Sequence, residues 1–308
     1  MADETQTVDS RLAAVRSLGH LPGTLDELAV HAGRQGDVLS DAALEALSRS
    51  EEPVRALSLL LTHGRGLASP VAVAAMGRCC AVVPPSRLGP LLEQALTGPA
   101  SKVTVRKQAV RLLERHRPPG AVDVLLRAWR NPDLHKDVRI AVAVALRQLP
   151  GSPEARESLA EVADRFASGE MLRALFQPSP WDFAPEHRPG YAALVRRLLA
   201  VARAPGVRYR GIKAFGMWVH CYQGGVTDIV AAVADPSDPS GAEQLPLFLA
   251  FMHAEIVHDE VVEVAERLVL AGPNTEARRR LSRIARDLPG HGASERGHDL
   301  AERLARLL

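Results

Sequence analysis

The stretch that decides the fold is DVRIAVAVALRQLP, Asp137 to Pro150. Its apolar residues fall two apart, which is the pattern of a half-buried β-strand. They are Val138, Ile140, Val142, Val144 and Leu146. Asp137, however, is typical of a helix N-cap, and the Leu-Pro that ends the stretch, followed by Gly151, is typical of a helix stop. The local sequence supports both a strand and a helix, so the choice depends on the rest of the chain.

A repeat of about 33 residues settles this choice. Starting at Val105, apolar or small residues occupy positions 0, +4, +7 and +8, which share one face of a helix. The same pattern begins at Leu39, Ala72, Val105, Val138, Leu172, Val207, Leu245 and Ala277, although the Leu172 repeat breaks off at Phe176. In this register Val138, Val142, Ala145 and Leu146 form one stripe. The opening stretch is therefore predicted to be a helix with a second apolar face at Ile140 and Val144.

A second set of amphipathic segments lies between these helices. The segments run over about 24–34, 53–62, 86–97, 119–130, 153–167, 189–203, 224–235, 257–271 and 293–308. Proline and glycine punctuate the joins, as in VPPS, RPPG and LPGSP, where proline suits a first helical turn and glycine the position after a helix. We therefore predict an all-α fold: one α-solenoid of about eight antiparallel helix pairs over 9–308, ending in a capping helix, after a disordered start at 1–8.

Composition narrows the class of protein. The chain has 308 residues, of which 46% are hydrophobic and 24% charged, so it is a folded chain and not a disordered one. A net charge of +2 does not by itself imply a nucleic-acid partner. Cys79, Cys80 and Cys221 form no CxxC pair, which argues against a disulfide framework and a zinc site. Without a signal-like start or a run of 18 apolar residues, we expect a cytoplasmic protein with no membrane partner.

An arginine directly follows the first stripe residue in five of the eight repeats: Arg106, Arg139, Arg173, Arg208 and Arg278. A helix that opens with Val-Arg, continues with small residues and ends in a Leu pair resembles the second helix of HEAT repeats. The resemblance covers about 24–308, with a period shorter than the usual ~40–47 residues. It implies that the second helices line a concave face, and that the arginine bonds between neighbouring repeats.

The insert SPWDFAPEHRPGY, Ser179 to Tyr191, interrupts the repeat and brings Trp181, Phe183 and Tyr191 into or beside a loop. Loops on rigid scaffolds often carry binding residues, so these three aromatics are candidate contacts. The other interpretation is a wedge of aromatic rings that fills the space left by the truncated helix after Phe176. The sequence favours the wedge.

Charge is unevenly arranged in the second half of the chain. No acidic residue occurs over 187–227, which holds Arg188, Arg196, Arg197, Arg203, Arg208, Arg210 and Lys213. Nine acidic residues and no Lys or Arg occur over 228–266. Two interpretations stay open: ion pairs between adjacent repeats, which is the default, or complementary patches for a charged protein partner.

We find no motif for catalysis, a metal or a cofactor. Trp129 and Asp133 have the four-residue separation used by alkylpurine DNA glycosylases built on HEAT-like repeats, but Trp129 occupies a core position. His253 and His258, in MHAEIVHDE, are five apart, which suits no single helix face, and the His-Glu dipeptides of di-iron HEAT hydroxylases are absent. Nucleotide-binding and hydrolase motifs are also absent, so an enzyme is the less favoured hypothesis.

The resulting prediction is a non-catalytic HEAT-like scaffold that binds a protein or peptide on its concave face. The second-helix positions that point away from the core supply the candidate residues: Lys107, Arg111, Ile140, Val144, Arg147, Tyr209 and Lys213. An apolar centre with basic flanks suits an acidic-hydrophobic peptide. The alternative is a DNA-binding or glycosylase-like protein that would place Arg106, Lys107, Arg111, Arg208, Arg210 and Lys213 on phosphates.

Overall fold

The helices predicted from the 33-residue register are present in the computed structural model, which describes residues 7–21, 23–34, 38–63, 69–149, 151–221, 226–235, 237, 241–253, 259–270, 275–291 and 295–308. Over these ranges the chain forms helices and turns, and no strand. The chain divides into two compact units, Met1–Leu149 and Pro150–Leu308. Each unit is a stack of helix pairs, so the predicted all-α solenoid fold class is confirmed, while a single solenoid over 9–308 stays a prediction.

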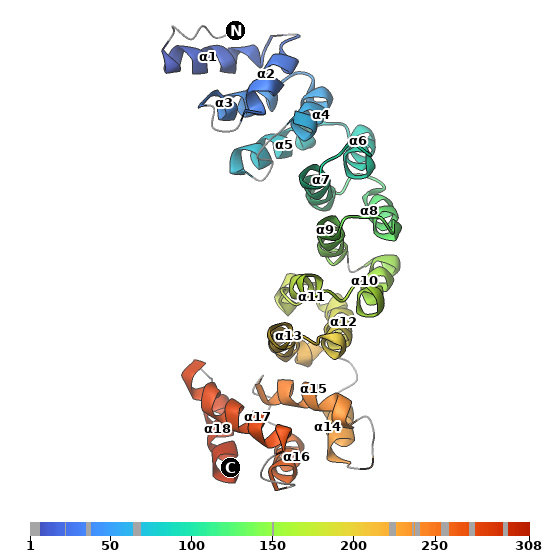
Figure 1. Ribbon diagram of the computed structural model, residues 1–308, viewed down its shortest axis with the longest axis vertical. Coiled ribbons are helices and arrows are strands. Elements are labelled where there is room, and N and C mark those ends of the chain that lie inside the picture. The colour runs from blue at the N-terminus through green and yellow to red at the C-terminus, as the bar shows by residue number, and fades with distance from the viewer. Residues whose placement is uncertain are drawn as a thin grey trace. The chain divides into compact units, whose positions relative to one another are not determined.

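The first unit contains two layers of helices (Figure 1). One layer holds α1 (Val8–Leu18), α3 (Val38–Leu47), α5 (Pro70–Val82), α7 (Val103–His116) and α9 (Lys136–Leu146), in which each helix contacts the next. The other holds α2 (Leu25–Ala32), α4 (Pro53–His63), α6 (Pro85–Thr97) and α8 (Ala121–Arg130). The repeated stripes of α3, α5, α7 and α9 therefore lie in a single layer.

The second unit continues the alternation of first and second helices. The first helices are α10 (Pro153–Arg165), α12 (Arg188–Val201), α14 (Val226–Ala234), α16 (Asp259–Leu270) and α18 (Glu295–Leu307). The second helices are α11 (Gly169–Leu175), α13 (Pro205–Trp218), α15 (Gly241–His253) and α17 (Glu276–Asp287). Short 3₁₀ turns lie at η1 (Pro180–Asp182), η2 (Pro185–His187), η3 (Val219–Cys221) and η4 (Leu288–His291). The first two belong to the insert that follows the short helix α11.

The predicted stripe is the core. Val138, Val142, Ala145 and Leu146 are each 0% exposed, and the corresponding residues of α3, α5 and α7 are buried as well. Burial is less complete toward the end of the chain, where Leu245, His253, Ile284 and Ala285 are half-buried. The period of the stripe, and not the local alternation of apolar residues, therefore decided the conformation of the opening stretch.

Two details at helix starts differ from the sequence analysis. Asp137 is not the N-cap of α9: His135 holds that position, and its Nδ1 accepts a hydrogen bond from the Asp137 amide at 3.2 Å. Asp137 instead lies in the first turn, where its charge suits the positive end of the helix dipole. Helix α1, capped by Thr7, was not part of the predicted register. Residues 1–6 lie outside the described ranges, so the disordered start stays a prediction.

Three of the five repeated arginines, Arg106, Arg139 and Arg278, tie together the two helices of one pair. Arg106 donates to the carbonyl of Gly98 at 3.0 Å, and Arg278 to that of Val269 at 3.3 Å. Arg139 donates to the carbonyls of Trp129, Asn131 and Pro132 at 2.8, 2.7 and 3.2 Å. These carbonyls end the preceding helix and lack partners within it, so a cation is well placed there. For these three arginines the bonding lies within a pair, where the resemblance implied bonding between neighbouring repeats; Arg278 also donates to the Leu308 carbonyl, beyond its own pair.

Ion pairs, by contrast, connect first helices of successive pairs. Arg55 pairs with Asp26, Arg127 with Glu93 and Arg197 with Asp164, each at 2.6 Å. These side chains are largely exposed, so each pair is worth about 0–1 kcal/mol. Arg197 belongs to the basic block of the sequence and finds its acid in the preceding pair, not in the acidic block. Within the described ranges, none of the helices is both long and apolar enough to cross a bilayer.

Candidate functional site

The face formed by α7 and α9 carries five of the predicted contact residues. Arg111 is exposed, while Lys107, Ile140, Val144 and Arg147 are half-buried. They lie at helical positions other than the buried stripe, and α7 contacts α9 directly. Ile140 and Val144 are therefore half-buried apolar side chains outside the stripe, on a helix that packs beside α7 and in the same layer as Lys107, Arg111 and Arg147.

The charge of the same layer changes sign along the first unit. Helix α3 presents Asp41 and Glu45, whereas α5 presents the exposed Arg78, whose Nε donates to Ser48 Oγ at 2.9 Å. From α5 to α9 the layer is therefore mainly basic. Sequence reasoning missed Arg78, although it occupies position +6 of its repeat, the same position as Arg111 and Val144.

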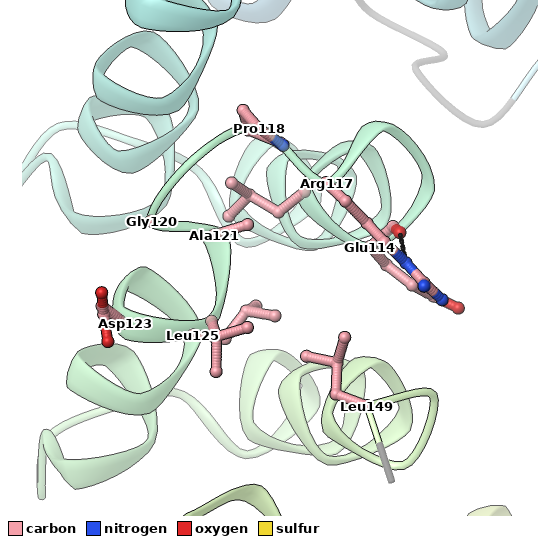
Figure 2. A pocket seen from close by; sticks show the side chains of 10 residues that line it. Glu114, Arg117, Pro118, Gly120, Ala121, Asp123, Leu125 and Leu149 are labelled. Atoms are coloured by element: carbon pink, nitrogen blue, oxygen red, sulfur yellow. Dashed lines mark hydrogen bonds between the residues drawn. The ribbon is translucent and has the colours of Figure 1, made fainter. Parts of the chain in front are cut away.

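A pocket of about 250 Å³ lies at the end of the α7–α9 face (Figure 2). Its walls come from the last turn of α7, the turn into α8, the start of α8, and Leu149 just after α9. Leu125 and Leu149 lie on facing sides, and Ala121 lies between them and the turn. Leu113 and Leu125 are 0% exposed, so the floor is apolar. Sequence reasoning gave no indication of this pocket.

Arg117 lies at the mouth of the pocket in an unusual backbone conformation. Within the described ranges, Arg117 is the one non-glycine residue whose φ is positive, at 44°. It is the C-cap of α7 and adopts the left-handed conformation. It also precedes Pro118, and a residue before proline normally prefers an extended conformation. Its Nε donates to the Glu114 carbonyl and its Nη2 to the Gln148 carbonyl, both at 3.3 Å. Such strain, about 1–3 kcal/mol, persists only where the surroundings enforce it.

Glu114 connects the face to the pocket. It follows Lys107 and Arg111 on the exposed side of α7 and also lines the pocket. Burial raises the pKa of its carboxyl, and the nearby Arg147, Arg117 and Arg111 act in the opposite direction. One carboxylate thus lies among three guanidinium groups, which leaves an excess of positive charge at this end of the face.

Tyr209 and Lys213 lie on α13 in the second unit. Tyr209 is 51% exposed, and the Lys213 Nζ lies 4.9 Å from the centre of its ring. Gly216, three residues after Lys213 on the same helix, is buried. Because these residues belong to the other unit, they make a separate candidate surface from the α7–α9 face.

The three aromatic candidates of the insert differ in exposure: two are buried and one is exposed. Phe183 and Tyr191 are 5% and 6% exposed and pack with Trp218, at ring-centre distances of 4.6 to 5.3 Å. The Tyr191 hydroxyl donates to the Leu175 carbonyl at 2.7 Å, and Trp218 Nε1 to the Pro178 carbonyl at 3.0 Å. These rings fill the space beside the short helix α11. Trp181 is 81% exposed, with the Arg188 guanidinium 5.1 Å from its ring centre, so it alone of the three is available to a partner.

Trp129 and Asp133, the pair considered for nucleoside chemistry, differ in their exposure to solvent. Trp129 is 2% exposed and Asp133 is exposed, so the tryptophan face is not open to a nucleoside. Within the described ranges, no three His, Cys, Asp or Glu side chains gather closely enough to hold a metal ion. Residues 254–258, which include His258, lie outside these ranges. Burial raises the pKa of Cys79 to about 11 and that of Cys80 to about 12, so both thiols stay protonated at neutral pH.

Comparison with known families agrees with this architecture. Residues 89–175, from α6 to α11, match the family model described as HEAT repeats. The matched segment includes α7, α9 and the whole pocket. No curated protein matches the chain.

Proposed function

We propose that this chain, a helical repeat protein whose residues 89–175 match the HEAT-repeat model, is a non-catalytic scaffold that binds an acidic protein segment or peptide. The proposed binding surface is the α7–α9 face. One observation supports the proposal: Ile140 and Val144 stay partly exposed outside the buried stripe, in the layer that also presents Lys107, Arg111 and Arg147. Protein interfaces commonly combine an apolar centre with a polar rim, and arginine is enriched in them.

The architecture supports an extended partner. Solenoids stack their repeats so that neighbouring helices make one continuous surface, which suits a segment that crosses several of them. The basic side chains of α5, α7 and α9 favour carboxylates, because complementary charge steers association and fixes the register of a partner. The cytoplasmic location and the lack of a cofactor stay predictions from the sequence.

A displayed library of random peptides, selected on the purified chain, tests the proposal. We expect enriched peptides that combine Asp or Glu with a large apolar residue. Ile140→Glu with Val144→Glu should abolish their binding, because it places carboxylates at the apolar centre. Val54→Glu on α4 is the matched control, since it adds a charge at an exposed valine of the other layer.

Two outcomes would contradict the proposal. A folded double variant that keeps full peptide binding would show that the face is elsewhere. A double variant that loses its helical circular dichroism would show that these side chains belong to the core. Duplex DNA is a useful second probe: binding that falls steeply with salt, and is lost on substituting Lys107 and Arg111, would favour the nucleic-acid alternative.

A further inference from the structure

The pocket at the end of the α7–α9 face has a size that limits its occupant. Sites for small organic ligands usually measure about 300–1,000 Å³, and this pocket measures about 250 Å³. It is also continuous with the proposed face, because Glu114 belongs to both. A single large side chain of a bound peptide fits these dimensions better than a free ligand does.

The lining indicates the character of that side chain. The floor consists of Leu113, Leu125 and Ala121, and the half-buried Leu149 closes the side opposite Leu125 (Figure 2). An apolar side chain would replace water there and gain roughly 25 cal/mol for each Å² that it buries. Leucine or phenylalanine therefore suits the interior.

The charges at the mouth indicate what flanks the apolar side chain. Arg117 and Glu114 line the mouth, and Arg111 and Arg147 lie close enough to affect the Glu114 carboxyl. Asp123 lies on the other side of the pocket (Figure 2). Three arginines therefore lie near the Glu114 carboxylate on the side that adjoins the face. Additional carboxylates from a partner would complement this excess of positive charge.

The backbone of Arg117 is a second, independent sign that the mouth is built for an arginine. Glycine would adopt the same left-handed conformation without strain, yet the chain places an arginine there and holds its guanidinium on the Gln148 carbonyl at 3.3 Å. The side chain is thereby fixed between the ends of α7 and α9. A guanidinium held in this way loses little freedom when it binds a carboxylate.

We propose that this pocket receives one apolar side chain, leucine or phenylalanine, of an acidic peptide whose carboxylates bind Arg111, Arg117 and Arg147. This inference rests on the proposed function and adds to it a specificity pocket. The peptide lies along the α7–α9 face and ends its contact where the two helices end.

Two labelled peptides test the pocket. Both consist of Glu and Asp, and they differ at one central residue, which is Phe in one and Ala in the other. We expect the chain to bind the Phe peptide at least about tenfold more tightly, since burying a large apolar side chain is worth about 1.5–3 kcal/mol. Fluorescence anisotropy measures both affinities.

Two pocket variants locate this preference. Ala121→Leu fills the pocket and should remove the preference for Phe while it leaves binding of the Ala peptide unchanged. Leu149→Ala enlarges the pocket from a half-buried position and should shift the preference toward a Trp peptide. Because the second variant removes atoms, it tests the pocket even if Ala121→Leu disturbs the fold. Glu114→Gln should tighten binding of both peptides, because it removes the carboxylate that competes for the arginines.

The outcomes separate the pocket from the proposed function. Equal binding of the Phe and Ala peptides, still lost in the Ile140→Glu, Val144→Glu variant, would overturn the pocket and leave the face intact. A preference for Phe that persists in both pocket variants would also overturn it. Absence of binding by either peptide would overturn the pocket, and the library selection would then decide whether the α7–α9 face binds a different partner.

Discussion

The regular pair α8–α9 and the interrupted region α11–α13 begin their second helices with the same Val-Arg or Leu-Arg pattern but hold together differently. In the regular pair, Arg139 is 6% exposed, lies over the Trp129 ring and bonds the end of α8. In the interrupted region, Arg173 is exposed, and the Nε of Arg208 is buried with no acceptor in the part of the chain that the structure describes. Burial lowers the pKa of Arg208, as do Arg280 and Arg203 nearby.

The difference shows that one sequence motif has two structural outcomes. In the regular pair, the carbonyls at the end of the preceding helix accept hydrogen bonds from the arginine, which thereby joins the two helices. Where the repeat is interrupted, aromatic packing takes over that role through Phe183, Tyr191 and Trp218. The first three predictions below test this contrast, beginning with the largest expected effect, and a fourth tests the burial of α5.

Trp218→Ala should lower the free energy of unfolding by about 3–5 kcal/mol, because it leaves a large cavity among the rings and an unpaired carbonyl at Pro178. Urea unfolding followed by circular dichroism measures the change. Trp181→Ala is the control, and its effect should stay within about 0.5 kcal/mol because that ring is 81% exposed. Similar losses for the two variants would mean that the aromatic cluster does not stabilise the insert.

Arg139→Ala should lower the free energy of unfolding by about 2–4 kcal/mol, since it removes the guanidinium that donates to the Trp129 carbonyl of α8 and to the Asn131 and Pro132 carbonyls of the turn after it. Arg208→Ala should change the free energy of unfolding by less than about 0.5 kcal/mol or stabilise the chain, because it relieves repulsion with Arg280 and Arg203. The same urea titration compares them. Equal losses of unfolding free energy for Arg139→Ala and Arg208→Ala would contradict the proposed difference between the two regions.

Gly211→Ala tests how tightly the interrupted region is packed. A Cβ at this position would lie 2.9 Å from both Leu199 Cδ1 and the Phe176 ring, so we expect a loss of about 1–3 kcal/mol. Gly206→Ala on the same helix meets nothing within 4 Å and should be neutral or stabilising by up to about 1 kcal/mol. Thermal unfolding of the two variants measures these changes. An unchanged unfolding temperature for Gly211→Ala would indicate that the helix has room to move.

The cysteines give the smallest effect and a pH test. Because the folded pKa values of Cys79 and Cys80 are raised to about 11 and about 12, their contribution to stability is complete below pH 9.0 and falls as the pH rises through those values. Wild type should therefore lose stability faster between pH 9 and pH 11 than Cys79→Ala. At neutral pH a thiol reagent should modify the half-buried Cys221 first. Rapid native labelling of Cys79 would contradict the burial of α5.

The repeat register predicted the fold because each second helix of a solenoid buries the same set of positions against its neighbours. The stripe that begins at Leu39, Ala72, Val105 and Val138 is buried throughout, so the helices and their core faces were predictable from spacing alone. The N-cap of α9 was not, because both His135 and Asp137 can cap a helix and the backbone of the preceding turn chose between them. The insert was predicted as a wedge, but which of its rings stays exposed depended on the position of Trp218.

The sequence by itself determined the helical period, the buried stripe and the apolar second face of the opening stretch, because each follows from the spacing of residues along one helix. The tertiary structure alone decided the rest. The pocket exists because the ends of α7 and α9 and the start of α8 meet, and their residues are up to 36 positions apart in the chain. Whether a repeated arginine forms hydrogen bonds to the preceding helix depended on where that helix ends, because its guanidinium needs backbone carbonyls within reach as acceptors.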